Sequence, residues 1–195
     1  MSVQHTKLRE VAEIQLGITL RGSDASRHDP AGTHHLIRIS DLSDDGSVSI
    51  REPSLVKLSP ADADRYEMKP GEVLVAARGT RMTAAVFYGG GGPCIVGSQF
   101  LVIRPRSGLN PEYLRWFLNL PVIQTKLFSS ARGTYVRSLP ISILGELEIP
   151  VPPLPKQHAV AELNRLRIRE KELMAELAEK RGTLVDHSVL QNFQT

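Results

Sequence analysis

The sequence of 195 residues has one cysteine and no long hydrophobic run. The single thiol, Cys94, excludes a disulfide framework within the chain, and no Cys and His residues have the spacing of a zinc site. No apolar run approaches the roughly 18 residues of a membrane span, and the first residues lead straight into charged sequence. We therefore expect neither a signal peptide nor a membrane anchor, no metal, and a reducing compartment, the cytoplasm.

Motifs for catalysis are also missing. Residues 92–99 have the glycine spacing of a phosphate loop but lack the lysine that would reach the phosphates. Residues 151–154 lack the polar residue and the aromatic that an amino-methyltransferase uses to bind a flipped base. Asp62, Asp64 and Glu67 lie on one expected short helix and its exit turn, whereas nuclease acids surround a metal from adjacent strands. The sequence therefore predicts that the chain is not an enzyme by itself.

Charge is distributed unevenly along the chain. Residues 1–68 hold eight Lys/Arg against eleven Asp/Glu, a net charge of −3, and residues 69–137 hold nine against two, a net charge of +7. Arginine dominates the second block, and its planar fork matches phosphates and guanine edges. Nucleic acid is the expected partner. A mixed surface, in which the acidic first third balances this block in space, is the alternative.

Short alternating and apolar runs predict a β-rich first part with turns and short helices. We expect a strand over 35–42 turning into 48–50, a capped helix after Ser59, a buried strand over 72–77, and strands over 84–87, 94–96 and 100–103. Helices are expected after Asn110 and from Pro121, with Trp116 and Phe117 in the core. His34 and His35 are interpreted as a surface pair, because no third metal ligand is near.

Two Arg-Gly-Thr triplets stand in the basic block. The first ends the buried strand and is followed by Arg81; the second is followed three residues later by Arg137. Glycine lets a backbone approach a ligand closely, so both are predicted contact loops for DNA. The candidate DNA-contacting residues are Arg78, Thr80, Arg81, Arg132, Thr134 and Arg137, with Arg38, Ser40 and Gln99 in second rank.

The C-terminal part follows a proline-rich joint. Four prolines between 150 and 155 predict a short extended segment, and no proline or glycine occurs from Lys156 to Arg181, which predicts a long helix. A narrow stripe of apolar residues, mainly leucines, on one face of this helix predicts that it pairs with a second helix as a coiled coil. Folding back onto its own domain is the alternative. The predicted dimer interface consists of Leu163, Leu166, Glu170, Leu173, Leu177, Lys180 and Leu184.

These observations predict an α/β fold with two parts. Residues 1–150 form a mixed, β-rich DNA-binding domain, and residues 151–195 form the proline-rich joint and a long helix for spacing and dimerisation. An antiparallel helix pair would bring Glu170 of one copy near Lys180 of the other.

Several segments, in order, resemble the specificity subunits of type I restriction-modification systems. They span nearly the whole chain: residues 7–14, 37–42, 69–80, 110–119, 133–136 and 149–157. The resemblance implies a target recognition domain that reads a few base pairs and a long helix that serves as spacer and docking rod for modification subunits. It implies double-stranded DNA, a methyltransferase subunit and a restriction subunit as partners. S-adenosylmethionine would belong to the methyltransferase, with no cofactor in this chain.

The family usually carries two recognition domains and two spacer helices, whereas this sequence has one of each. It resembles a half-length form that acts as a homodimer on a bipartite, palindromic site, that pairs with another half, or that is an inactive fragment. A stand-alone DNA-binding regulator, or an adaptor for a nuclease, is the alternative from another class.

Overall fold

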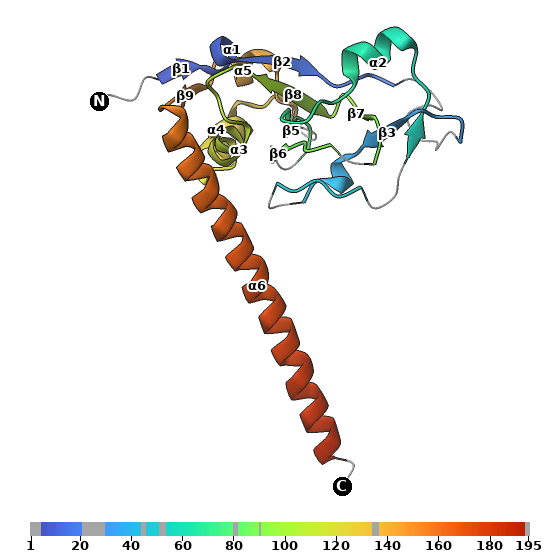
Figure 1. The fold of residues 1–195 in the computed structure, drawn as a ribbon, viewed down its shortest axis with the longest axis vertical. Coiled ribbons are helices and arrows are strands. Elements are labelled where there is room, and N and C mark those ends of the chain that lie inside the picture. The colour runs from blue at the N-terminus through green and yellow to red at the C-terminus, as the bar shows by residue number, and fades with distance from the viewer. Residues whose placement is uncertain are drawn as a thin grey trace. The chain divides into compact units, whose positions relative to one another are not determined.

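The computed structural model describes residues 5–20, 30–43, 46–50, 54–79, 82–89, 91–133 and 137–193. It has the expected mixed α/β composition, and a long helix follows the proline-rich joint (Figure 1). Two compact units are present, residues 1–158 and residues 159–195. In chain order the elements are β1 (His5–Lys7), α1 (Leu8–Val11), β2 (Ala12–Leu16), β3 (His34–Ile37), the 3-10 turn η2 (Ile39–Asp41), β4 (Leu55–Val56), α2 (Pro60–Tyr66), β5 (Val73–Ala76), β6 (Ala84–Val86), β7 (Cys94–Val96), β8 (Phe100–Pro105), α3 (Pro111–Leu118), α4 (Pro121–Ser130), α5 (Ile141–Gly145), β9 (Glu148–Pro150) and α6 (Leu154–Asn192).

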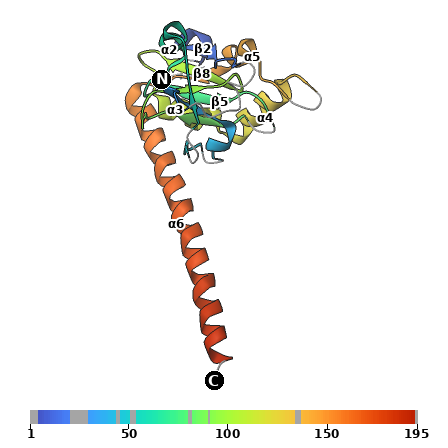
Figure 2. The same ribbon diagram turned by 90° about the vertical axis from the view of Figure 1, so that its right-hand side faces the viewer.

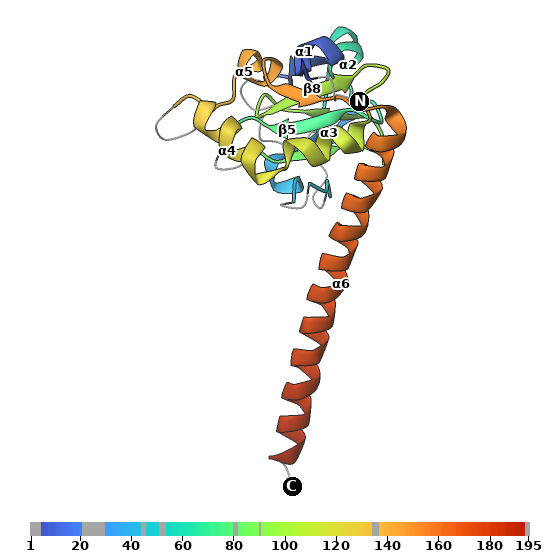
Figure 3. The ribbon, with the colours of Figure 1, turned by 90° about the vertical axis from the view of Figure 1, so that its left-hand side faces the viewer.

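A four-stranded antiparallel sheet in the order β2-β8-β5-β6 is the centre of the first unit. Figure 3 shows β8 and β5 between the helices α1 and α5 and the helices α3 and α4. A second sheet has the order β4-β3-β7, with β3 and β7 parallel. Strand β1 pairs with β9, so the first strand lies beside the one that precedes the proline-rich joint.

The core lies where the two larger sheets meet. Leu74, Phe87, Phe100 and Val102 from the four-stranded sheet and its extensions pack in one buried cluster with Ile37 and other residues of the three-stranded sheet. The short strands that supply these side chains are apolar at nearly every position. Continuous apolar runs of this kind are typical of strands that are buried on both faces. The continuous run predicted as a buried strand over 72–77 is β5, whose four residues are all buried.

Helix starts follow the predicted caps. The Ser59 hydroxyl accepts from Asp62 N at 3.1 Å, and the Asn110 side chain accepts from Tyr113 N at 2.9 Å. In each case proline occupies the first turn, where its missing N–H is not needed. Phe117 is buried as expected, and Trp116 is half-buried.

The strand predicted over 35–42 is too long. Strand β3 ends at Ile37, because the Asp41 carboxylate accepts from Arg38 N at 2.8 Å and Asp41 N donates to Arg38 O at 3.0 Å, which turns the chain into η2. The expected hairpin with 48–50 is reduced to one bridge between Leu42 and Val48. The partners of β3 are instead β4 and β7.

Helix α6 has 39 residues and continues through Gly182 (Figure 2). Glycine in a helix interior costs about 1 kcal/mol relative to alanine, so the neighbouring helix formers outweigh it here. No helix in the described part of the chain is both long and apolar enough to cross a membrane.

Candidate nucleic-acid interface

One end of the four-stranded sheet carries residues from both predicted contact loops. Strand β5 leads into Ala77, Arg78 and Gly79, and β8 starts immediately after Gln99. Ala77 N donates to Gln99 O at 2.8 Å, so these two segments lie side by side. Gly79 has a φ of 116°, which favours glycine, and this explains why the triplet needs a glycine where the strand ends.

The second Arg-Gly segment joins the same end of the sheet through Ser138. Arg132 N donates to Ser138 O at 2.9 Å, and Ser138 N donates to Arg132 O at 2.8 Å. On its other side Ser138 forms an antiparallel bridge with Arg78, and Gly79 N donates to Arg137 O at 3.1 Å. Ser138 therefore lies between Arg78 and Arg132, and the two Arg-Gly segments, 54 residues apart in the sequence, are brought together.

The side chains of Arg78 and Arg132 are exposed. Among the described residues neither guanidinium has a hydrogen-bonding or ionic partner. Gln99 is also exposed and its amide has no such partner either. We refer to Arg78, Gln99 and Arg132 as the sheet-end cluster.

Arg137 differs from the other two arginines. It is half-buried, its Nη1 donates to Phe128 O at 2.8 Å, and its guanidinium lies 4.4 Å from the centre of the Phe128 ring. These contacts tie the second Arg-Gly segment to α4. Arg137 therefore has a structural role in this chain, whether or not it also contacts DNA as predicted.

The three second-rank candidates lie around one hollow of about 320 Å³. Arg38, Ser40 and Gln99 line it together with apolar residues of the segments 18–20 and 36–39. The Arg38 Nη2 atom donates to the hydroxyl of the buried Ser54 at 2.9 Å, whereas Ser40 and Gln99 are exposed. The hollow adjoins the sheet-end cluster because Gln99 belongs to both.

Other arginines of the basic block are engaged within the domain. Arg104 forms an ion pair with the buried Glu72, and Arg115 pairs with Glu112 at 2.7 Å. Arg106 donates to the backbone oxygen of Glu10 at 3.2 Å. The net charge of this block therefore overstates the charge available to a ligand, which could not be known before the partners were placed.

Three predicted contact residues, Thr80, Arg81 and Thr134, lie outside the described residues. The interpretation of His34 and His35 as a surface pair is wrong for His34, which is 7 % exposed. Its Nδ1 lies 2.8 Å from the Thr33 hydroxyl, and its Nε2 lies 3.6 Å from a Glu67 carboxylate oxygen. Strand β3 pairs on both sides, and this burial of its first residue was not visible in the sequence.

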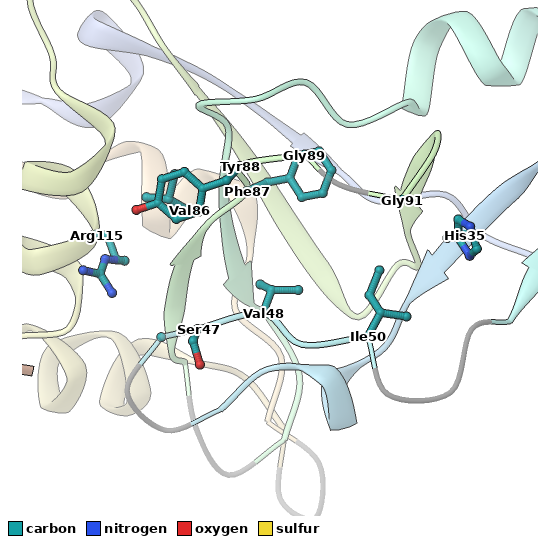
Figure 4. A pocket seen from close by; sticks show the side chains of 11 residues that line it. His35, Ser47, Val48, Ile50, Val86, Phe87, Tyr88, Gly89, Gly91 and Arg115 are labelled. Carbon is teal, nitrogen blue, oxygen red and sulfur yellow. The ribbon is translucent and has the colours of Figure 1, made fainter. Parts of the chain in front are cut away.

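A second, more apolar hollow of about 510 Å³ was not predicted, and it is lined by residues of the segments 46–50 and 86–89 together with His35 and Arg115. Figure 4 shows His35 at one end and Arg115 at the other, with Val48, Ile50 and Phe87 between them. The His35 Nδ1 atom is buried without a hydrogen-bond partner among the described residues. Arg115 is held by Glu112, so this hollow offers mainly apolar contact.

The predicted dimer residues lie on α6. Leu163, Leu166, Leu173, Leu177 and Leu184 are between 44 % and 68 % exposed. Glu170 is exposed, and Lys180 forms an ion pair with Glu176 of its own helix at 2.7 Å. An exposed leucine stripe is the feature expected of a helix that packs on another helix.

The fold is shared with solved specificity subunits. A chain of a type I R-M system, from a study of complex assembly and conformational transition, matches with a TM-score of 0.66, 19 % identity, and coverage of 88 % of this chain and 39 % of that one. The HsdS subunit from Thermoanaerobacter tengcongensis matches with a TM-score of 0.60 and 20 % identity over 86 % of this chain and 37 % of that one. The S subunit from M. genitalium matches with a TM-score of 0.60 and 18 % identity over 91 % of this chain and 42 % of that one.

This chain thus spans about two fifths of the length of these structures. At these identities the likeness shows the fold. A comparison of the sequence with curated proteins gave no match. The family model described as the type I restriction modification DNA specificity domain matches residues 2–174, most of the chain. The chain therefore belongs to the family of type I restriction-modification DNA specificity domains.

Proposed function

We propose that this chain recognises a DNA sequence through the sheet-end cluster and directs a partner methyltransferase, with its restriction subunit, to that sequence. The observation that carries the proposal is the placement of Arg78 and Arg132 on either side of Ser138, exposed and without partners among the described residues. Exposed arginines suit both phosphates and guanine edges, because the guanidinium binds either in a bidentate manner.

The size of the cluster supports reading of a short site. The segments of Gln99, Arg78, Ser138 and Arg132 lie side by side in this order, and the three spacings between them, at about 4.8 Å each, give a width of roughly 14 Å. The major groove is about 12 Å wide, and bases along one strand are about 3.4 Å apart. We infer that one copy of the chain reads about four base pairs.

Helix α6 supplies the second part of the proposal. Its exposed leucines pair with those of a second copy in antiparallel orientation, the arrangement that brings Glu170 of one helix near Lys180 of the other. In such a pair Lys180 would form an ion pair with Glu170 of the other copy, either in place of its ion pair with Glu176 or in addition to it. A two-fold protein dimer reads two half-sites in opposite orientation, so the target is an interrupted palindrome.

Methyl transfer belongs to the partner in this proposal. The methyltransferase subunit binds S-adenosylmethionine and flips the target base, and this chain supplies position and orientation. The helices α6 separate the two recognition units and set the gap between the half-sites.

Arginine variants of the cluster test the DNA-binding part. Arg78→Ala and Arg132→Ala are titrated with labelled duplex at two salt concentrations, with Arg65→Ala as the matched control. Arg65 is exposed on α2, which comes before the start of β5, whereas the sheet-end cluster follows the end of this strand. We expect each cluster variant to weaken binding by about 1–3 kcal/mol if it contacts a base, or to reduce the salt slope by about 1 if it contacts a phosphate. Unchanged affinity and salt slope in both variants would contradict the proposal.

A further inference from the structure

Gln99 differs from the arginines of the sheet-end cluster because its side chain is a neutral amide with both a donor and an acceptor. We propose that Gln99 reads the adenine of an A·T base pair in the target and is the residue that sets specificity at that position. The inference rests on the proposed function and names the base class that the cluster recognises.

The turn that carries Gln99 is fixed on both sides. Phe100 N donates to Gly97 O at 3.0 Å, which closes the turn, and Ala77 N holds the Gln99 carbonyl at 2.8 Å. On the opposite side, a Cβ added to Gly17 would lie 2.2 Å from Gly97 O, so the end of β2 packs directly against the turn. Because the backbone of this turn is already ordered, only the side-chain torsions of Gln99 lose freedom on binding, which favours discrimination between bases.

The amide matches one base. In the major groove adenine presents the N7 acceptor and the N6 donor, and a glutamine amide binds both, whereas guanine presents two acceptors and is the partner of arginine. With no partner for its amide among the described residues, Gln99 has no internal contact to break. Arg38, in contrast, lines the same hollow but donates to Ser54, so it is less available for reading a base.

The hollow beside Gln99 supports the same base pair. Its half-buried wall includes Leu20 and Ile39, and Ile18 and Leu36 lie deeper. Thymine carries a methyl group at the major-groove edge of an A·T pair, next to the adenine positions that an amide binds, and apolar side chains contact it. An amide beside an apolar hollow is therefore the combination that an A·T pair requires.

Selection from a random duplex library is the first arm of the test, made with the full chain. The wild type should select a site with one A·T pair that Gln99→Ala no longer discriminates, with a loss of roughly 5- to 150-fold at that position only. Gln99→Glu should shift the preference at the same position toward cytosine, because a carboxylate accepts from its N4 amino group. Gln15→Ala is the matched control, since Gln15 is half-buried on β2 and lines a different hollow with Glu13 and Asp64.

Modified bases are the second arm. Replacing that adenine by 7-deazaadenine removes the N7 acceptor, and replacing its thymine by deoxyuridine removes the methyl group. Both replacements should weaken wild-type binding, and the first should have no effect on Gln99→Ala.

The outcomes separate the two proposals. If the wild type selects a defined site and Gln99→Ala selects it with the same discrimination at every position, Gln99 is not the reader and the DNA-recognition function stands. If the wild-type chain selects no sequence at all, the proposed function itself is contradicted, and this inference with it.

Discussion

The side-chain amide of Gln157 holds the backbone N–H of Asn110, which donates to Gln157 Oε1 at 2.8 Å. The Nε2 atom of the same amide donates to Gly108 O and to Pro152 O, each at 2.7 Å. Asn110 in turn caps α3 through its own side chain. Gln157 is fully buried, so the first turn of α6 is fastened to the turn that precedes α3.

Gln157→Leu removes this fastening while retaining most of the side-chain volume. The Asn110 N–H and two carbonyls lose their partner. Gly108 is exposed, so water can replace the contact to its carbonyl, whereas the Asn110 N–H left unsatisfied costs about 1–3 kcal/mol. We expect the free energy of unfolding from urea titration to fall by at least that amount. Lys156→Ala, at the adjacent exposed position, should change it by less than about 0.5 kcal/mol. Equal free energies of unfolding for the two variants would show that the hydrogen bonds of the Gln157 amide do not stabilise the fold.

Asn119 closes the edge of the sheet at β6. Ala84 N donates to Asn119 Oδ1 at 2.8 Å, and Asn119 Nδ2 donates to Ala84 O at 2.7 Å, so the amide replaces a neighbouring strand. Asn119→Asp keeps the acceptor but places a carboxylate against the Ala84 carbonyl. We expect Asn119→Asp to lower the unfolding free energy by about 1–3 kcal/mol. A thermal or urea midpoint equal to that of the wild type would be inconsistent with this role.

The same substitution at two glycines should have opposite effects. Gly79 has a φ of 116°, so Gly79→Ala strains the backbone and is expected to destabilise the domain by about 1 kcal/mol or more. Gly182 lies within α6, with nothing within 4 Å of an added Cβ, so Gly182→Ala should stabilise the helix by about 1 kcal/mol. Urea unfolding and helical circular dichroism measure the two effects. A loss of helicity in Gly182→Ala would contradict the helix described here.

The reactivity of the Cys94 thiol can be used to test whether β7 is buried. Burial raises the pKa of its thiol above the usual value, and the Glu67 carboxylate adds to the shift. Since the thiolate is the reactive form, a raised pKa means less thiolate at any given pH below it. We expect a disulfide-exchange reagent to label Cys94 slowly in the folded chain and rapidly in urea. Labelling of the folded chain at the rate of a free thiol near pH 8 would show that β7 is accessible.

Local signals in the sequence predicted much of the fold. Ser59 and Asn110 mark helix starts because their caps depend on neighbours within three residues, and β5 is recognised because its residues are apolar without interruption. The end of β3 at Ile37 depends on the Asp41 carboxylate turning back to Arg38 N. The alternating apolar and polar residues over 35–42 fit a strand as well as they fit this turn, so the sequence alone favoured a longer strand.

The candidate site was predictable only in part. The triplets predicted Arg78 and Arg132 as DNA contacts, which stays a prediction, and the convergence of both segments on Ser138 depends on pairing between parts far apart in the chain. The arginines that pair internally, such as Arg104 with Glu72, look the same in the sequence as those that are exposed. Gln157 was recognised as part of a resembling segment, while its role in holding Asn110 required the structure.

The chain by itself is expected to have no methyltransferase or nuclease activity. Residues 151–154 lack the polar and aromatic residues that bind a flipped base. Transfer of labelled methyl groups to DNA should appear only after a modification subunit is added. Incorporation by the purified chain alone would overturn this expectation.

The most direct test maps methylated adenines in cells that carry only this chain and its modification partner. We expect one interrupted palindrome, with two half-sites of about four base pairs and a fixed gap, that disappears when the chain is deleted. We also expect Arg78→Ala or Arg132→Ala to relax or abolish the pattern. An asymmetric two-part site would contradict the two-fold pairing of α6, and methylation that does not depend on this chain would contradict its role in DNA recognition.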